Sequence, residues 1–142
     1  MGECRIGPNR VRVDGDLITS YVGGPGTLAT AIPFHALAEQ VLAEHGRVFL
    51  LTVNEANYGL DSEARRYAFN WLRTHRVSAA AMVGGGTVLR TTLTLLARAL
   101  VLFSTDIPPF IFVASEHEAR SYIDQQRRRI SGPSISSELP PI

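Results

Sequence analysis

The sequence contains no lysine, and all of its 14 basic residues are arginine. These arginines are balanced by 13 acidic residues, so the chain lacks the clustered positive charge that binds the phosphate backbone of a nucleic acid. The one basic run, Arg127-Arg128-Arg129, stands where a helix is expected to end, and the helix dipole favours cations there. We therefore predict that nucleic acid is not a partner of this chain.

Cysteine and long apolar runs are also scarce. Cys4 is the only cysteine, which excludes an intrachain disulfide and a zinc site built from cysteines. The N-terminus has no basic segment followed by an apolar run, so a cytoplasmic protein is expected. The most apolar window, residues 88–103, is shorter than a membrane span and contains Arg90 and Arg98. We interpret it as a buried helix rather than an integral membrane segment.

Apolar periodicity predicts strands that alternate with helices after an opening β-hairpin. Asp14-Gly15 is typical of a type I′ hairpin turn, and Pro33 and Gly46 are typical of the first and last turns of a helix. The expected strands are residues 10–13, 17–22, 47–53, 78–83 and 110–114, and the expected helices are residues 33–46, 62–75, 87–103 and 115–129. The predicted fold is α/β: a mixed sheet of about five strands that opens with a β-hairpin, followed by alternating helices and parallel strands.

All of these elements are expected to belong to one domain, residues 10–129. Residues 1–9 are predicted to be a flexible N-terminus. Residues 130–142 are rich in serine and proline and are predicted to be a disordered tail, because they lack the apolar side chains that a core requires.

Four short features accompany this predicted topology. They are Gly15-Asp16, Tyr58-Gly59-Leu60-Asp61, Trp71 followed by His75, and Ala79-Ala80-Ala81-Met82-Val83-Gly84. With the order of elements over residues 11–128, they resemble the STAS domain, the fold of bacterial anti-sigma-factor antagonists. Within that superfamily the chain is more similar to divergent STAS-like proteins of bacteria. The resemblance implies a STAS-like fold and a non-catalytic signalling module that acts through protein–protein interaction.

The resemblance also points to the start of the helix at residue 62. In the antagonists this helix opens with Asp-Ser and then Ser or Thr, and the second hydroxyl is the phosphate acceptor. The matching residues here are Asp61, Ser62, Glu63 and then Ala64. A partner site at Asp61, Ser62 and Glu63 is therefore implied, and phosphorylation at the family's acceptor position is not expected to switch it. Ser62 stays open as an acceptor, although a serine beside aspartate at a helix start more commonly serves as a cap.

The helix at residues 62–75 has two faces of different composition. Its expected buried stripe is Ala64, Tyr67, Ala68, Trp71 and Leu72. The opposite stripe is Arg66, Phe69, Asn70 and Arg73, at spacings i, i+3, i+4 and i+7. An outward phenylalanine between two arginines has the composition of an interface, so this stripe extends the predicted partner site. A solvated face with one exposed phenylalanine is an equal alternative.

The helix at residues 87–103 is apolar over most of its circumference. Only Arg90, Thr94 and Arg98 form a narrow polar line, at spacings i, i+4 and i+8. A helix that packs on one sheet face needs a narrower apolar stripe than this. Two explanations are open: the tail and neighbouring loops cover the helix, or a second copy of the chain covers it in a homodimer.

An alternative function is the binding of a small ligand or nucleotide at the carboxyl ends of the parallel strands. The candidate residues are Gly84, Gly85, Gly86 and Thr87, with the loop at residues 54–60. A glycine-rich turn before a helix can present amides to an anion. The wider phosphate-binding pattern and its lysine are absent, so a tight strand-to-helix turn is the interpretation that we favour.

The sequence shows no constellation of catalytic residues. His35, His45, His75 and His117 lack metal-ligand spacing with one another. No nucleophile, base and orienting group can be placed together. We therefore expect no enzymatic activity, no metal and no cofactor.

Overall fold

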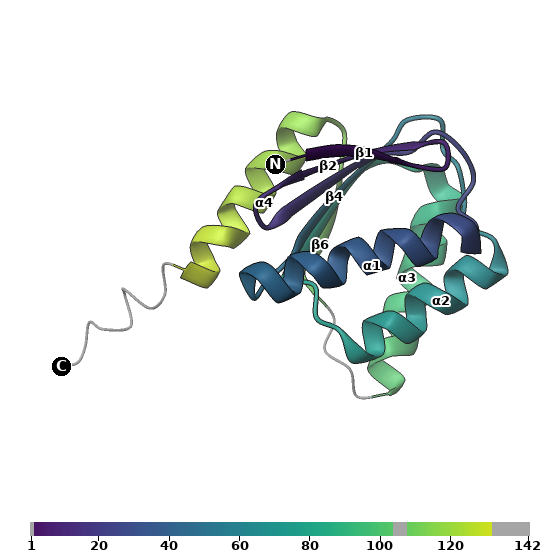
Figure 1. Ribbon diagram of the computed structural model, residues 1–142. Coiled ribbons are helices and arrows are strands. Elements are labelled where there is room, and N and C mark those ends of the chain that lie inside the picture. The colour runs from purple at the N-terminus through teal and green to yellow at the C-terminus, as the bar shows by residue number, and fades with distance from the viewer. Residues whose placement is uncertain (1, 104–107, 132–142) are drawn as a thin grey trace.

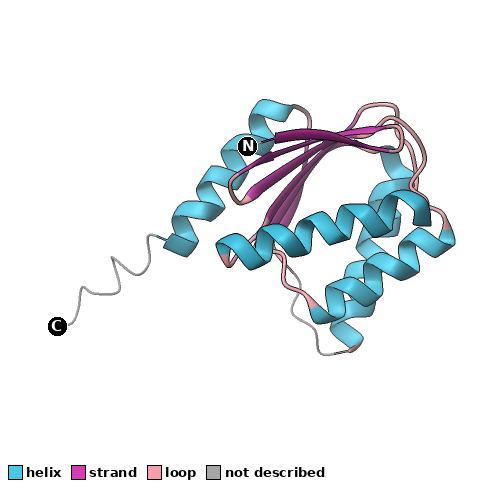
Figure 2. Ribbon diagram, in the orientation of Figure 1, coloured by secondary structure: helices cyan, strands magenta, loops and turns pink. Residues whose placement is uncertain are grey.

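The computed structural model describes residues 2–103 and 108–131, which fold into a sheet flanked by helices (Figures 1 and 2). The strands are β1 (Gly2–Ile6), β2 (Asn9–Asp14), β3 (Leu17–Tyr21), β4 (Phe49–Asn54), β5 (Ala79–Gly84) and β6 (Phe110–Val113). The helices are α1 (Leu28–His45), α2 (Ser62–Thr74), α3 (Gly86–Leu102) and α4 (Glu116–Ser131). No helix within these residues is long and apolar enough to cross a membrane. Of the tail predicted at residues 130–142, Ile130 and Ser131 belong to α4 and the rest lies outside the described residues.

The six strands form one mixed sheet in the order β1-β2-β3-β4-β5-β6. β1 pairs antiparallel with β2, and β2 pairs antiparallel with β3. From β3 to β6 the neighbouring strands are parallel, and each is joined to the next by a helix. The predicted α/β fold, with its opening hairpin and its alternating helices and parallel strands, is confirmed.

The sheet has one strand more than the sequence predicted. Residues 2–6, which were expected to be flexible within the segment 1–9, form β1 and pair with β2 from Gly2↔Val13 to Ile6↔Asn9. Ile6 is buried, whereas the other residues of β1 are exposed. With a single buried side chain, β1 has no apolar alternation that would reveal it, and its backbone pairing with β2 holds it in place.

The turn of the β2–β3 hairpin differs in type from the prediction. Its central residues are Gly15 and Asp16, because Asp14 pairs with Leu17. Gly15 has a φ of +60°, and Asp16 is not among the described residues that have a positive φ. A positive φ at the first central position alone is the pattern of a type II′ turn rather than the expected type I′.

Helix α1 begins earlier than predicted, at Leu28 instead of near Pro33. Thr27 is the N-cap, and Thr30 closes the first turn: its hydroxyl accepts the Thr27 N–H at 3.1 Å and donates to the Thr27 carbonyl at 3.0 Å. Pro33 therefore lies inside the helix, where it supplies no N–H for the usual bond to the carbonyl four residues earlier.

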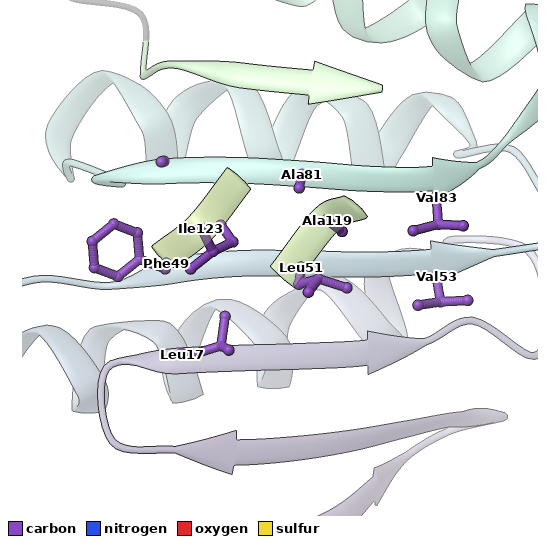
Figure 3. Packing of buried hydrophobic residues seen from close by; sticks show 9 residues of the cluster. Leu17, Phe49, Leu51, Val53, Ala81, Val83, Ala119 and Ile123 are labelled. Atoms are coloured by element: carbon purple, nitrogen blue, oxygen red, sulfur yellow. The ribbon is translucent and has the colours of Figure 1, made fainter. Parts of the chain in front are cut away.

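The helices α1, α2 and α3 lie on one face of the sheet, and α4 lies on the other (Figure 1). On the α4 side, alternate residues of three strands pack against Ala119 and Ile123 of α4 (Figure 3). They are Leu17, Phe49, Leu51, Val53, Ala79, Ala81 and Val83. Their neighbours in sequence, Ile18, Leu50 and Ala80, join the core on the opposite face. The central strands are apolar on both faces because helices cover both.

The core beneath α1 and α2 is organised around Trp71, which is 5% exposed. Its ring stacks on His75 at a centroid distance of 4.3 Å and lies 4.9 Å from the ring of His35 on α1. Its Nε1 donates to Glu39 Oε2 at 2.8 Å, which ties α2 to α1 a second time. Of the stripe expected to be buried on α2, Ala64 and Trp71 are buried, and Tyr67, Ala68 and Leu72 are half-buried.

A buried carboxylate joins the hairpin, the segment just before β4, and α4. Asp16 is 9% exposed and accepts hydrogen bonds at 2.7 Å from Arg47 Nε and from Arg127 Nη2. Burial alone would raise the pKa of Asp16, but the bonds from Arg127 and Arg47 outweigh it and lower that pKa. Arg127 therefore does more than complement the helix dipole, because it anchors the end of α4 to the sheet.

Candidate binding site at the carboxyl edge of the sheet

Two loops meet beyond the carboxyl ends of β3 and β4. The Gly26 N–H donates to the Gly59 carbonyl at 2.8 Å, and the Asp61 N–H donates to the Gly26 carbonyl at 2.9 Å. Asn54 shapes the second loop: its Nδ2 donates to the Tyr58 carbonyl at 2.8 Å, and its Oδ1 accepts the Tyr58 N–H at 3.0 Å. These bonds fix the position from which α2 begins.

Asp61, rather than the expected Ser62, is the N-cap of α2. Its Oδ1 accepts the Ala64 N–H at 2.8 Å. Ser62 and Glu63 are the first two residues of the helix, and both are exposed. The carboxylate of Glu63 lies where the helix dipole favours negative charge, so it stabilises the helix start. Asp61 already has a structural role there, and Ser62 and Glu63 are the neighbouring side chains that are open to a partner.

The second predicted stripe of α2 faces solvent only in part. Arg66, Asn70 and Arg73 are exposed, whereas Phe69 is half-buried. The Phe69 ring meets the Phe103 ring at the end of α3 edge-on, with 5.5 Å between centroids. The Arg73 guanidinium lies 4.5 Å from the Phe103 centroid and 5.8 Å from the Phe69 centroid. Phe69 is therefore not an isolated outward aromatic, as the sequence suggested, but part of a Phe69–Arg73–Phe103 cluster between α2 and α3.

Helix α3 keeps part of its apolar surface open to solvent. Its residues Leu89 and Leu100 are buried, with 5% and 2% of their surface exposed. Leu95 and Leu102 are 57% and 84% exposed and form a row on the side of α3 away from that pair. The part of the chain that the structure describes does not cover this row.

The turn Gly84-Gly85-Gly86 packs against the loop that follows β4. All three glycines have positive φ. The Gly85 N–H donates to the Asn54 carbonyl at 2.8 Å, and a Cβ at Gly84 would lie 2.5 Å from the same oxygen. Close backbone packing accounts for these glycines, and the Gly85 amide is not open to an anion. Thr87 is exposed on the first turn of α3.

A cavity of about 240 Å³ lies beneath the two loops, between the sheet and the helices. Ser20 of β3 and Thr52 of β4 contribute hydroxyl-bearing side chains to its wall, and the turn at residues 84–87 does not line it. A second cavity, of about 190 Å³, is lined almost wholly by apolar residues and shares Thr52, Met82 and Leu93 with the first. The loop at residues 54–60, which the sequence proposed for a ligand, contributes Asn54, Tyr58, Gly59 and Leu60 to this cavity. The cavity itself and the part of Ser20 in its wall were not predicted, and the one signal for them was a hydroxyl, Thr52, in a strand expected to be apolar.

The titratable residues near this edge have structural partners. His35 Nδ1 donates to the Ala31 carbonyl at 2.7 Å, and burial lowers the pKa of His35. The Tyr21 hydroxyl donates to Glu116 Oε2 at 2.8 Å, and the same oxygen accepts Arg120 Nη2 at 2.8 Å. Burial, together with the bond to Glu116, raises the pKa of Tyr21. Within residues 2–103 and 108–131, no three histidine, cysteine or acidic side chains gather closely enough to hold a metal ion.

Comparison with known proteins identifies the fold. No family model and no curated protein matches the sequence. The structure is similar to the crystal structure of an uncharacterized protein of the DUF3478 family, with a SpoIIAA-like fold, from Shewanella loihica. The likeness covers 80% of this chain and 90% of that chain, with a TM-score of 0.55 and 18% sequence identity. The chain therefore has a SpoIIAA-like, that is STAS-like, fold, as the sequence resemblance implied.

Proposed function

We propose that this chain is a non-catalytic, STAS-like regulatory module that binds a protein partner through the exposed face of α2. The proposed partner surface contains the seven residues that the sequence indicated, and the structure adds Phe103 beside them. These residues are Asp61, Ser62, Glu63, Arg66, Phe69, Asn70, Arg73 and Phe103.

The observation that carries this proposal is the Phe69–Arg73–Phe103 cluster. Phe103 is 55% exposed, although it contacts both other members of the cluster. Aromatic and arginine side chains are enriched at interface cores. The ring–ring and cation–π contacts also hold these side chains in place before a partner arrives, which reduces the entropy that binding must lose.

The charges along α2 indicate the chemistry of the partner. Arg66 and Arg73 are exposed along the helix, and Glu63 is exposed at its start. A partner that fits this surface has an apolar group against the exposed Phe103 ring and carboxylates that face the two arginines. Such complementary charges contribute to specificity and to the rate of association.

Reversing the charge of Arg66 should weaken partner binding by at least about tenfold, because Arg66→Glu places a carboxylate opposite the partner's carboxylates. The wild-type chain serves as bait for the partner in a lysate of the native host. The purified partner is then titrated against each variant by calorimetry. Arg66 is preferable to Phe69 as a probe, because truncating Phe69 also removes the contact with Phe103 on α3.

Arg128→Glu is the matched control for this titration. Arg128 is exposed on α4, on the opposite face of the sheet, and its substitution changes the net charge by the same amount. It should bind the partner as the wild type does, and circular dichroism should show both variants folded. If Arg66→Glu binds with wild-type affinity, the face of α2 is not the partner surface.

We also propose that the chain forms a homodimer through the exposed row Leu95 and Leu102 on α3. Large exposed apolar patches mark protein interfaces, and Val101 and Phe103, next to Leu102, are also more than half exposed. Light scattering across a concentration series should report twice the mass of the chain, and Leu102→Glu should convert the dimer to a monomer with an unchanged circular dichroism spectrum. A wild-type chain that stays monomeric at every concentration would contradict the dimer and leave the proposed partner surface on α2 unaffected.

A further inference from the structure

Ser20 carries a buried hydroxyl that has no hydrogen-bond partner among the described residues. It is 6% exposed and lies on β3, between Val11 of β2 and Thr52 of β4. Buried polar groups are normally hydrogen-bonded, and leaving one unpaired destabilises the folded state. Ser20 also lines the cavity of about 240 Å³ at the carboxyl edge. Its oxygen as placed is out of reach of a water molecule in the cavity, so a bond to the contents of that cavity requires the hydroxyl to turn about the Cα–Cβ bond.

Thr19, the preceding residue, makes a useful comparison. Its hydroxyl is also buried and unpaired within the described part of the chain. However, its side chain points to the opposite face of the sheet, beneath α4, and it does not line the cavity. Threonine is common in strands because its branched side chain packs well against its neighbours. Serine lacks this methyl group, so packing explains Thr19 but does not explain Ser20.

The wall of the cavity does not suit a charged ligand. None of its lining residues is an arginine, an aspartate or a glutamate. His35 lies in the wall, but its Nδ1 is bonded to the Ala31 carbonyl, and burial lowers its pKa, so it is neutral near pH 7. Asn54 also lies in the wall, and its amide is already bonded to the Tyr58 backbone. Burying an unpaired charge is costly, so an occupant of this cavity is uncharged.

The size and lining of the cavity indicate the size and polarity of the molecule that it can hold. Val11, Phe34 and Leu60 are among the apolar residues that line the cavity together with Ser20. An apolar cavity of about 150 Å³ is enough to hold benzene, and this one is about 240 Å³. We propose that the cavity binds a small uncharged molecule that has one apolar ring and a hydroxyl group, with the hydroxyl bonded to Ser20. This site is separate from the proposed partner surface on α2.

The test is a titration of the isotope-labelled full chain, followed by ¹H–¹⁵N correlation spectra, with phenol, toluene and benzoate as probes. Phenol should cause saturable shifts at Ser20, Thr52 and Ala68. Toluene, which lacks the hydroxyl, should bind roughly 3- to 10-fold more weakly, the usual contribution of one net hydrogen bond. Benzoate should not bind at this site, because its carboxylate would be buried without a countercharge.

Two variants assign the binding to Ser20 and to the cavity. Ser20→Ala should bind phenol no better than toluene, because the phenol hydroxyl then has no partner in the cavity. It should be at least as stable as the wild type, because it removes an unpaired polar group. Ala68→Leu should fill the cavity from α2 and abolish binding of both probes. The proposal is overturned if phenol causes no saturable shift in the wild type, as expected of a cavity that holds only water, or if the shifts lie elsewhere. It is also overturned if Ser20→Ala keeps the preference for phenol, a result that does not depend on whether Ala68→Leu folds.

Discussion

Replacing Trp71 by alanine should lower the free energy of unfolding by about 3–5 kcal/mol, the range typical of tryptophan and phenylalanine truncations in protein cores. The indole fills the space between α1 and α2, stacks on His75 and donates its N–H to Glu39. Alanine leaves a cavity there and removes both contacts. Single domains are stable by about 5–15 kcal/mol, so this loss is a large share of the total. Urea unfolding followed by circular dichroism measures it without relying on the tryptophan that is removed.

Two further variants show what the indole contributes. Trp71→Phe keeps an aromatic ring but loses the Nε1 donor, so it should cost less than half as much as Trp71→Ala. Ile32→Ala removes an aliphatic side chain that is 47% exposed on α1, and it should change the stability by no more than about 0.5 kcal/mol. If Ile32→Ala destabilises the protein as much as Trp71→Ala, the effect is not due to core packing around the indole.

The parts of the fold that the sequence predicted well are those that local signals specify. Helix α2 follows an apolar strand, has Asp61 as its N-cap and shows two stripes at helical spacing. The strand-to-helix order and the residue at which the helix begins depend on neighbouring residues only, so they could be predicted without tertiary information, although the cap is Asp61 rather than the expected Ser62. The same is true of the glycine turn before α3, where a tight backbone turn was the favoured explanation.

The features that the sequence did not reveal arise from contacts between distant segments. β1 is held by pairing with β2 rather than by its own apolar pattern. Phe69 looked outward on a helical wheel, but it contacts Phe103, which lies 34 positions further along the chain by residue number. The cavity near Ser20 exists because three helices and two loops meet over the sheet. The partner surface remains a prediction, since the sequence proposed its residues and the structure only shows how they lie.

Replacing Asp16 by asparagine should lower the free energy of unfolding by about 2–4 kcal/mol at pH 7. The carboxylate accepts charge-assisted bonds from Arg47 and Arg127, and removing it takes the Asp16 carboxylate away from both guanidinium groups, although Arg127 keeps its ion pair with Asp124. The loss should stay below the largest values for buried ion pairs, because these arginine side chains are 32% and 31% exposed and keep some contact with water. Urea unfolding at neutral pH measures it, and the end of α4 should show faster amide exchange in the variant.

The pH dependence of this difference identifies the carboxylate as its cause. The pKa of Asp16 is lowered in the folded state, so its contribution to stability is complete above the unfolded-state value of about 3.9 and is lost as the pH falls through the folded-state value. The stabilities of the wild type and Asp16→Asn should therefore converge below about pH 4. Asp14→Asn is the matched control: its partner Arg12 is 46% exposed, and such a surface pair contributes at most about 1 kcal/mol. A difference between wild type and Asp16→Asn that stays constant from pH 7 to acid would mean that the amide perturbs the hairpin turn and that the ion pairs contribute little.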